Sequence, residues 1–434
     1  MAKQIKAYVE VEPYNEISPG RGSEPAALVG SVLVADDFGR ALARLAETAV
    51  GTAAPARVLS GPHGVGKSTL LAVAHAIASE PATFNRSPHQ DVRTASSMLS
   101  ESRVIPVLID PSDDASDDFG ASMRKGFTAA ANAASRVGIS AADWDGACQA
   151  PDPADRALDL LPPGSRLVLF VDGASSWLRR VERDTARAAI ASLARVAERA
   201  HAEAISLVIA LDEETLDGGS GLALPLLRYC QVEYVPLTVL AQSCDRHLFK
   251  KTGRQRAELG LLYDELKSAS PLFRWSREEF VGMYPLHPGT VEVAPALSRY
   301  APSFSFLRFA STAGNRAKGR RDLSLIVLDE LFDACEYEMR KEADLAGVFE
   351  IYDDFVNNVV PKLSDSHHKF WAKLVLKGLF LSSLAGRAVS AITSPRCWRA
   401  RRRRKWRAAA RCGSRRRSRR QSSSMAARSA SAPR

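Results

Sequence analysis

The sequence has few cysteines, and none is placed for a disulfide framework or a structural metal site. No two of them form a CxxC pair or share a zinc-ligand spacing. A chain of 434 residues with 46% hydrophobic residues can bury a large core without such bridges, in two or three domains. A reducing cytoplasm is therefore the expected location. The six cysteines are Cys148, Cys230, Cys244, Cys335, Cys397 and Cys412.

Long apolar runs are also missing. The best candidate, Leu374–Leu384, is too short for a membrane span and is interrupted by Lys377. The N-terminal residues MAKQIKAYVEVEPYNE lack the apolar stretch of a signal peptide. We therefore expect neither a membrane-spanning helix nor a cleaved leader, and no membrane partner.

Acidic residues are absent from the last part of the chain, which accounts for the whole basic excess. Residues 395–434 hold 15 Arg and one Lys, so the remaining 43 basic residues face 49 acidic ones and leave −6 instead of +10. The body is thus not the basic surface typical of nucleic-acid-binding domains. The Arg-, Ala- and Ser-rich composition of the tail predicts disorder.

Two interpretations of this basic tail stay open. Its Arg clusters, together with Trp398 and Trp406, can bind and stack on nucleic acid, which keeps DNA open as a direct or indirect partner. Alternatively, the abrupt change of composition near 387–395 is what a GC-rich gene yields when it is read out of frame. We favour the second interpretation, under which the natural protein is longer than this chain.

Short apolar runs alternate with helical patterns over residues 51–240. The runs are continuous rather than alternating, as strands covered on both faces are. Between them, apolar residues recur at helical spacing, as Leu70, Val73 and Ile77 do. This order predicts an α/β fold with a five-stranded, mostly parallel sheet and flanking helices. The expected strands are 56–61, 103–110, 166–173, 205–212 and 231–238.

The rest of the chain completes a four-part organisation. After residue 240 the strand signals stop, and helical periodicity appears in pieces such as 276–284, 322–345 and 369–386. We expect a helical lid or partner domain there. The expected parts are an approach segment with a helix at 1–50, an α/β core at 51–240, the helical domain at 241–390 and the disordered tail at 391–434.

One motif carries chemistry at a specific spacing. GPHGVGKST, residues 61–69, matches G-x-x-x-x-G-K-[ST], follows an apolar run and opens a helical pattern. Glycines let the loop turn its N–H groups towards phosphate oxygens, and the helix N-terminus adds its positive dipole end. The sequence therefore predicts a P-loop NTPase fold with a nucleotide-binding loop. Its expected binding residues are Gly61, Pro62, His63, Gly64, Val65, Gly66, Lys67, Ser68 and Thr69.

The hydroxyl group of Ser68 and the carboxyl group of Asp172 are expected to hold Mg²⁺ beside the nucleotide. Lys67 can reach the β- and γ-phosphates, and the Ser68 hydroxyl can bind the ion. Asp172 ends the most apolar run, at the edge where parallel sheets bind ligands, so Lys67 and Asp172 are the expected catalytic residues. The alternative for Asp172 is an ordinary turn. ATP is the expected nucleotide because no [NT]-K-x-D guanine motif follows a strand.

An acid that related ATPases often carry is missing. The position after Asp172 is Gly173, so a carboxylate to polarise the attacking water is not supplied there. Glu182 and Asp184 lie on the next helical segment. The chain is therefore either an ATPase with a replacement acid or a nucleotide-bound switch or scaffold with little turnover. Under the second hypothesis, Gly173→Glu should raise the rate of hydrolysis.

Three further polar features have two interpretations each. Asp212, at the end of the 205–212 run, can sense the γ-phosphate or merely begin a solvated loop. Arg228 can reach the nucleotide of a neighbouring subunit in a homo-oligomer, or form a surface salt bridge. The acidic stretch 110–118 can hold a divalent ion, but a solvated helix N-terminus is the favoured interpretation.

These motifs resemble those of AAA+-type P-loop ATPases over residues 51–240. Segments 284–311 and 325–338 resemble the large ATPases of bacterial phage-defence islands of the bacteriophage-exclusion (BREX) type. The resemblance implies ATP-dependent exclusion of phage DNA together with other defence proteins, and a ring-shaped oligomer by analogy. Lys67, Ser68 and Asp172 match the expected motif positions, whereas Gly173 does not. Because such relatives are often far longer, the resemblance also implies a truncated or frameshifted C-terminus.

Overall fold

A computed structural model describes most of the chain as two compact units. The nucleotide-loop unit is Pro13–Leu248 with Ser305–Arg308, and the helical unit is Met1–Glu12, Phe249–Phe304 and Phe309–Arg434. The expected tail at 391–434 lies outside the described residues, and the expected domain boundary at 240 stays a prediction. The described residues are 3–14, 28, 34–112, 117–217, 221–271, 273–301 and 303–386.

The nucleotide-loop unit is built on a five-stranded parallel sheet, which confirms the predicted fold class. Its strand order is β3-β4-β5-β2-β6, so the strand before the loop lies next to β5 and one strand away from β4. A parallel sheet brings the C-terminal ends of these strands to one edge. The strands are β2 (Ala56–Gly61), β3 (Arg103–Ile109), β4 (Ser165–Val171), β5 (Ile205–Asp212) and β6 (Gln231–Tyr234).

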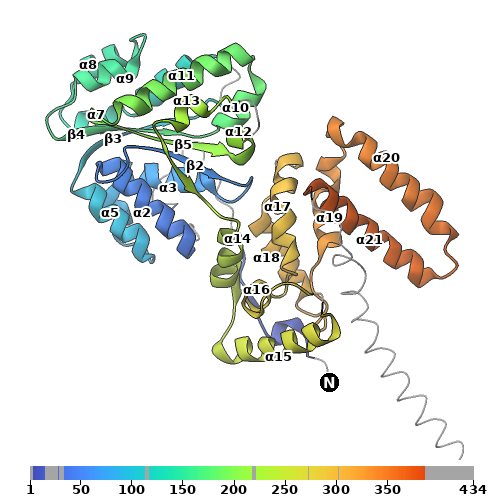
Figure 1. Cartoon of the computed structure of the whole chain (residues 1–434). Coiled ribbons are helices and arrows are strands. Elements are labelled where there is room, and N and C mark those ends of the chain that lie inside the picture. The colour runs from blue at the N-terminus through green and yellow to red at the C-terminus, as the bar shows by residue number, and fades with distance from the viewer. Residues whose placement is uncertain are drawn as a thin grey trace, which may run out of the picture. The chain divides into compact units, whose positions relative to one another are not determined.

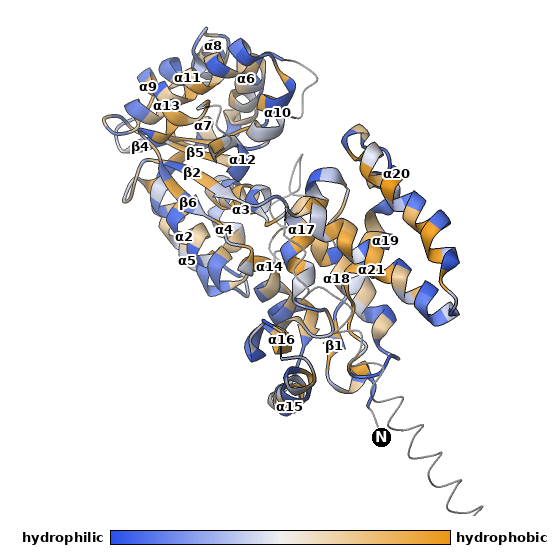
Figure 2. Cartoon of the chain, turned by 45° about the vertical axis from the view of Figure 1, so that its right-hand side comes forward, coloured by the Kyte–Doolittle hydropathy of each residue, from blue (hydrophilic) through white to orange (hydrophobic). Residues whose placement is uncertain are grey.

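Helices cover both faces of this sheet, as Figure 1 shows. Every residue of β2 and β5 is buried, which explains why these strands read as unbroken apolar runs. Figure 2 shows the same strands as apolar bands between the helical layers. One face packs on α2 (Asp36–Val50), α3 (Lys67–Ser79) and α5 (Gln90–Ser100). The other packs on α6 (Phe119–Ala129), α8 (Ala141–Cys148), α10 (Ala174–Arg180) and α11 (Arg183–Arg199).

The last predicted strand, at 231–238, was expected to be buried on both faces, but β6 is partly exposed. β6 has one neighbour, β2, and its Val232 and Tyr234 are 50% and 51% exposed. Glu233 is buried instead, because Arg44 binds both of its carboxylate oxygens at 2.7 and 2.8 Å. The apolar run at 231–238 therefore marks an edge strand.

The helical unit is mostly helical, as predicted. A small antiparallel pair, β1 (Glu10–Val11) and β7 (Phe249–Lys250), joins its N-terminal and middle segments. One of its hydrophobic clusters is formed by helices α17, α19, α20 and α21. None of the described helices is long and apolar enough to cross a membrane. The helices are α15 (Gly253–Ala269), α16 (Arg277–Met283), α17 (Gly289–Tyr300), α18 (Phe306–Ala317), α19 (Leu328–Met339), α20 (Ala346–Asp354) and α21 (Ser366–Leu384).

One predicted helical stretch, 322–345, is shorter than its periodicity indicates. The backbone of Ile326 donates to Pro285 O at 3.0 Å and accepts from His287 N at 2.9 Å. These two bonds form an isolated strand-like bridge between Leu286 and Ile326. Because they hold Ile326 in an extended conformation, α19 begins two residues later, at Leu328.

Candidate active site

The phosphate loop connects β2 to α3 in a conformation that its sequence imposes. Gly61 has φ +151°, and a Cβ atom there would lie 2.4 Å from the carbonyl oxygen of Val235. A side chain at this position would push β6 away from the loop. The helix then begins at Lys67, so its first N–H groups, which have no intrahelical acceptors, lie at the loop. The chain from Gly61 to Thr69 thus has the strand, loop and helix context that phosphate binding requires.

Lys67 is held inside the loop by three acceptors. Its Nζ donates to Gly61 O at 2.7 Å and to Pro62 O at 2.8 Å, and lies 2.9 Å from Asp212 Oδ1. The residue is 8% exposed, so its ammonium depends on these contacts rather than on water. An ammonium group has three protons, and each has an acceptor here. Phosphate oxygens would have to replace some of these acceptors when a nucleotide binds.

Asp212 lies close to three basic side chains, His63, Lys67 and Arg179. It ends β5 in register with Gly61, which places it beside the loop. Its carboxylate lies 2.8 Å from His63 Nε2, 2.9 Å from Lys67 Nζ and 3.3 Å from Arg179. Burial alone raises the pKa of Asp212, but the His63 hydrogen bond and the charges of Lys67 and His63 outweigh it and hold that pKa well below its usual range. At 7% exposed, Asp212 does not begin a solvated loop.

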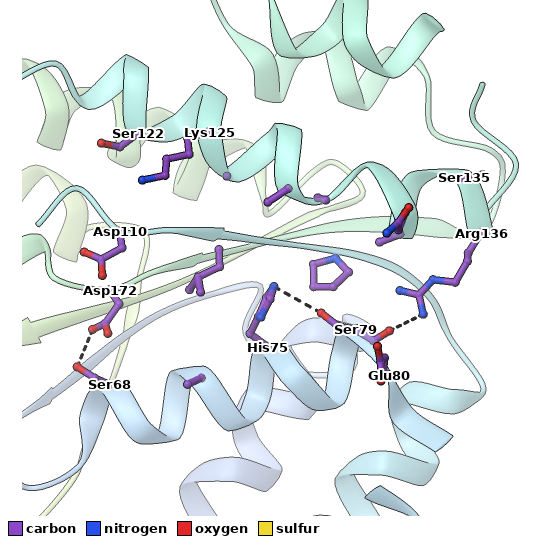
Figure 3. Close-up of a pocket in the computed structure, with 18 residues that line it drawn as sticks. Ser68, His75, Ser79, Glu80, Asp110, Ser122, Lys125, Ser135, Arg136 and Asp172 are labelled. Carbon is purple, nitrogen blue, oxygen red and sulfur yellow. Dashed lines mark hydrogen bonds between the residues drawn. The ribbon is translucent and has the colours of Figure 1, made fainter. Parts of the chain in front are cut away.

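Ser68 and Asp172 meet between the loop and the end of β4. Ser68 Oγ donates to Asp172 Oδ1 at 2.9 Å (Figure 3). Burial raises the pKa of Asp172, and the nearby charge of Asp110 raises it further, against the hydrogen bonds from Ser68 and the Gly173 N–H. A hydroxyl and a carboxylate oxygen are ligands that suit Mg²⁺. The described residues contain no group of three or more metal-binding side chains, so phosphate oxygens and water would have to complete the coordination.

A side chain at the position after Asp172 would collide with the side chains of two neighbouring residues unless they moved. Gly173 has φ +63°, a left-handed conformation that favours glycine. A Cβ atom there would lie 2.3 Å from Ser112 Oγ and 2.4 Å from Asp110 Oδ1. Gly173→Glu would therefore force the Asp110 and Ser112 side chains to shift and would strain the backbone, and the expected gain in hydrolysis stays a prediction.

The acidic stretch 110–118 divides into residues with different surroundings, and 113–116 lie outside the described part. Asp118 caps α6 by accepting from Gly120 N at 2.8 Å and pairs with Arg124 at 3.0 Å, as a helix N-terminus should. Asp110 instead lies at the C-terminal end of β3 beside Asp172. Sequence analysis included Asp110 only in the acidic stretch 110–118, for which it favoured a solvated helix N-terminus, and missed its place beside Asp172, although its position at the end of an apolar run was a usable signal.

A cavity of about 830 Å³ begins at the carboxylates of Asp110 and Asp172 and extends along β3, as Figure 3 shows. Its polar lining includes Ser68, Asp110, Ser122, Lys125, Arg136 and Asp172. The volume is in the range of small-molecule sites. The carboxylates thus face a space in which water or part of a ligand can lie.

Among the described residues, no contact links Arg228 to Lys67, Asp172 or Asp212. It follows α13 (Leu224–Leu227) and is exposed. Within the described part of the chain no carboxylate lies close enough to form an ion pair with it, so the salt-bridge alternative has no partner there. Arg179, which sequence analysis did not single out, contacts the site through Asp212.

Comparison with known families agrees with this geometry. Residues 39–209 match the family described as AAA ATPase domain. This part of the chain is similar to that domain. The match runs from α2 to β5, and it includes the phosphate loop and Asp172.

Three solved structures similar to the chain have low identity. The Orc1 protein of Aeropyrum pernix, solved in complex with DNA, is 17% identical with a TM-score of 0.31, over 86% of this chain and 80% of that one. Its Orc2 protein, solved with ADPNP and ADP, is 13% identical with a TM-score of 0.32, over 80% and 85%. Cdc6p of Pyrobaculum aerophilum is 9% identical with a TM-score of 0.32, over 84% and 85%. A comparison with curated proteins finds no match.

Proposed function

We propose that this chain is a Mg²⁺-dependent ATPase whose cycle drives a conformational change. The observation that carries the proposal is the meeting of Lys67, Ser68 and Asp172 around one loop. Lys67 is buried against the loop carbonyls, and Ser68 is bonded to Asp172 at 2.9 Å. These are the groups that phosphoryl transfer requires on the enzyme side.

Each of the three residues has a separate role in this proposal. Lys67 exchanges its loop carbonyls for β- and γ-phosphate oxygens. Ser68 and Asp172 hold Mg²⁺, which when bound neutralises the charge on those phosphates. Asp212, with Arg179 and His63 beside it, keeps the end of β5 close to the γ-phosphate position and reports its occupancy.

The test is titration with a fluorescent ATP analogue and Mg²⁺, followed by phosphate release in the same sample. Lys67→Ala is expected to weaken analogue binding by about 2–3 kcal/mol, because a charge-assisted phosphate contact is lost. Lys341→Ala, on an exposed lysine of the helical unit, is the matched control. Unchanged binding by Lys67→Ala, with the control also unchanged, would sink the proposal.

A nucleotide-bound switch or scaffold is the second candidate. The specific observation in its favour is Gly173, where no side chain can polarise the attacking water. Tight analogue binding with no phosphate release from the wild-type protein would support the switch and refute steady ATP hydrolysis. Binding with steady release would reverse that conclusion.

We further propose that the ATPase acts in the cytoplasm within a phage-defence complex. The support is the resemblance of segments 284–311 and 325–338 to phage-defence ATPases, and the four free cysteines of the described residues suit a reducing compartment. Defence proteins, phage DNA and other copies of this chain are the proposed partners, with exposed Arg228 available to a neighbouring copy. In a host carrying the defence genes, Lys67→Ala should then abolish protection from phage.

A further inference from the structure

We propose that Asp110 is the general base of this ATPase, in place of the acid that position 173 does not carry. The inference rests on the proposed ATPase function and adds the group that activates the attacking water. Hydrolysis needs a carboxylate near the attacking water, and a glycine at 173 cannot supply one. The neighbouring strand supplies it instead.

The register of β3 and β4 brings Asp110 to the level of Asp172. Ile109 pairs with Val171, and the Asp172 N–H donates to Ile109 O at 2.9 Å. Neighbouring strands lie about 4.8 Å apart, so the residues that follow these two partners are side by side. Asp110 therefore leaves β3 next to the residue that is expected to hold Mg²⁺.

The Asp110 carboxylate occupies the space into which a side chain at 173 would grow. An ideal Cβ at Gly173 would lie 2.4 Å from Asp110 Oδ1. Position 173 is where related ATPases carry the acid. The carboxylate has thus been supplied from β3 rather than from β4, at the same place in the site.

Ser112 orients this carboxylate through one of its two oxygens. The Ser112 N–H and Oγ–H donate to Asp110 Oδ1 at 2.9 and 2.5 Å. Among the described residues no donor binds Oδ2, and Asp110 lines the same cavity as Ser68 and Asp172. The carboxylate is held in position by one oxygen and keeps the other for a proton.

The other acids near the site have different partners. Asp212 lies within 3.3 Å of three cationic side chains, and Asp118 caps α6. Asp184, which the sequence offered as a substitute, has a 93% exposed side chain and pairs with Arg187. Each of these acids thus has a cationic or helix-capping partner, whereas among the described residues Asp110 is held by Ser112 alone.

The step is a hydrolysis. The water oxygen forms a bond to the γ-phosphorus, and the bond from that phosphorus to the β–γ bridging oxygen breaks. Asp110 Oδ2 takes a proton from the water and later releases it to solvent. The products are ADP and inorganic phosphate, and no redox partner is involved.

The experiment compares wild-type protein with Asp110→Asn, measuring Mg²⁺-ATP analogue binding and phosphate release on each sample. Asparagine keeps an oxygen for Ser112 but cannot accept the proton. We expect unchanged binding and a fall in kcat of about 100-fold or more. Asp184→Asn is the matched control and should leave both measurements unchanged.

The outcomes separate this inference from the proposed function. If the wild-type protein binds no analogue, the proposed function fails. If it binds and hydrolyses, and Asp110→Asn hydrolyses at the same rate, Asp110 is not the base. Should Asp110→Asn not fold, Ser112→Ala decides, since freeing the carboxylate should lower kcat several-fold without weakening binding. Unchanged kcat in Ser112→Ala would overturn the inference.

Discussion

The two halves of the candidate site, at the same edge of one sheet, have opposite electrostatic surroundings. At the ends of β2 and β5, the Asp212 carboxylate is matched by Lys67, His63 and Arg179. At the ends of β3 and β4, Asp110 and Asp172 accept hydrogen bonds from Ser112 and Ser68, and within the described part of the chain neither carboxylate forms an ion pair. The first half has cations to exchange for phosphate, and the second has carboxylates suited to a metal ion and to water.

The largest expected effect comes from removing charge from the carboxylate half. Asp172→Asn should slow Mg²⁺-dependent phosphate release, because Mg²⁺ loses its carboxylate ligand. The activation free energy of the reaction should rise by several kcal/mol. Analogue binding in the absence of Mg²⁺ should be unchanged, because the Lys67 half is intact. Parallel titrations with Mg²⁺ and with EDTA measure both. Equal loss of binding under the two conditions would contradict the division into two halves.

A smaller effect of opposite sign is expected in the cationic half. Asp212→Asn removes the charge that holds Lys67 at 2.9 Å. The ammonium is then released more easily to phosphate, and analogue binding should tighten by up to about 2 kcal/mol. Direct titration of the variant against the wild type measures the change. Weaker binding would mean that Asp212 positions the loop rather than competing with the nucleotide.

The smallest expected effect is on the free energy of unfolding, to which Asp172 and Asp212 contribute with opposite pH dependence. The pKa of Asp172 is raised, so its contribution to stability is present below the usual value of 3.8 and lost as pH rises through its folded pKa. The pKa of Asp212 is lowered, so its contribution is present above 3.8 and lost as pH falls through its folded pKa.

Without Mg²⁺ at pH 7, Asp172→Asn should therefore raise the free energy of unfolding and Asp212→Asn should lower it, each by about 1 kcal/mol. Urea denaturation of the two variants beside the wild type is the measurement. Changes of the same sign in both variants would show that the two carboxylates do not differ in the way their surroundings imply.

The sequence predicted those parts of the site that are local along the chain. The phosphate loop and its helix follow from glycine spacing, and Asp172 follows from its place at the end of an apolar run. Asp110 and Arg179 were missed because their roles depend on which strands are neighbours. The same limit explains β6, since an apolar run cannot tell an edge strand from a central one. Likewise, the start of α19 depends on a bridge between Leu286 and Ile326.

The crowding around Gly173 also has an evolutionary consequence. A glutamate gained there would force the side chains of Asp110 and Ser112 to move, because its Cβ would meet them at less than 3 Å. The two positions are therefore expected to covary among related sequences. Homologues with an acid at the position of Gly173 should carry a small, uncharged residue at the position of Asp110, and homologues with the aspartate should keep the glycine. Such an exchange would let the acid move between neighbouring strands while the chemistry of the site is kept.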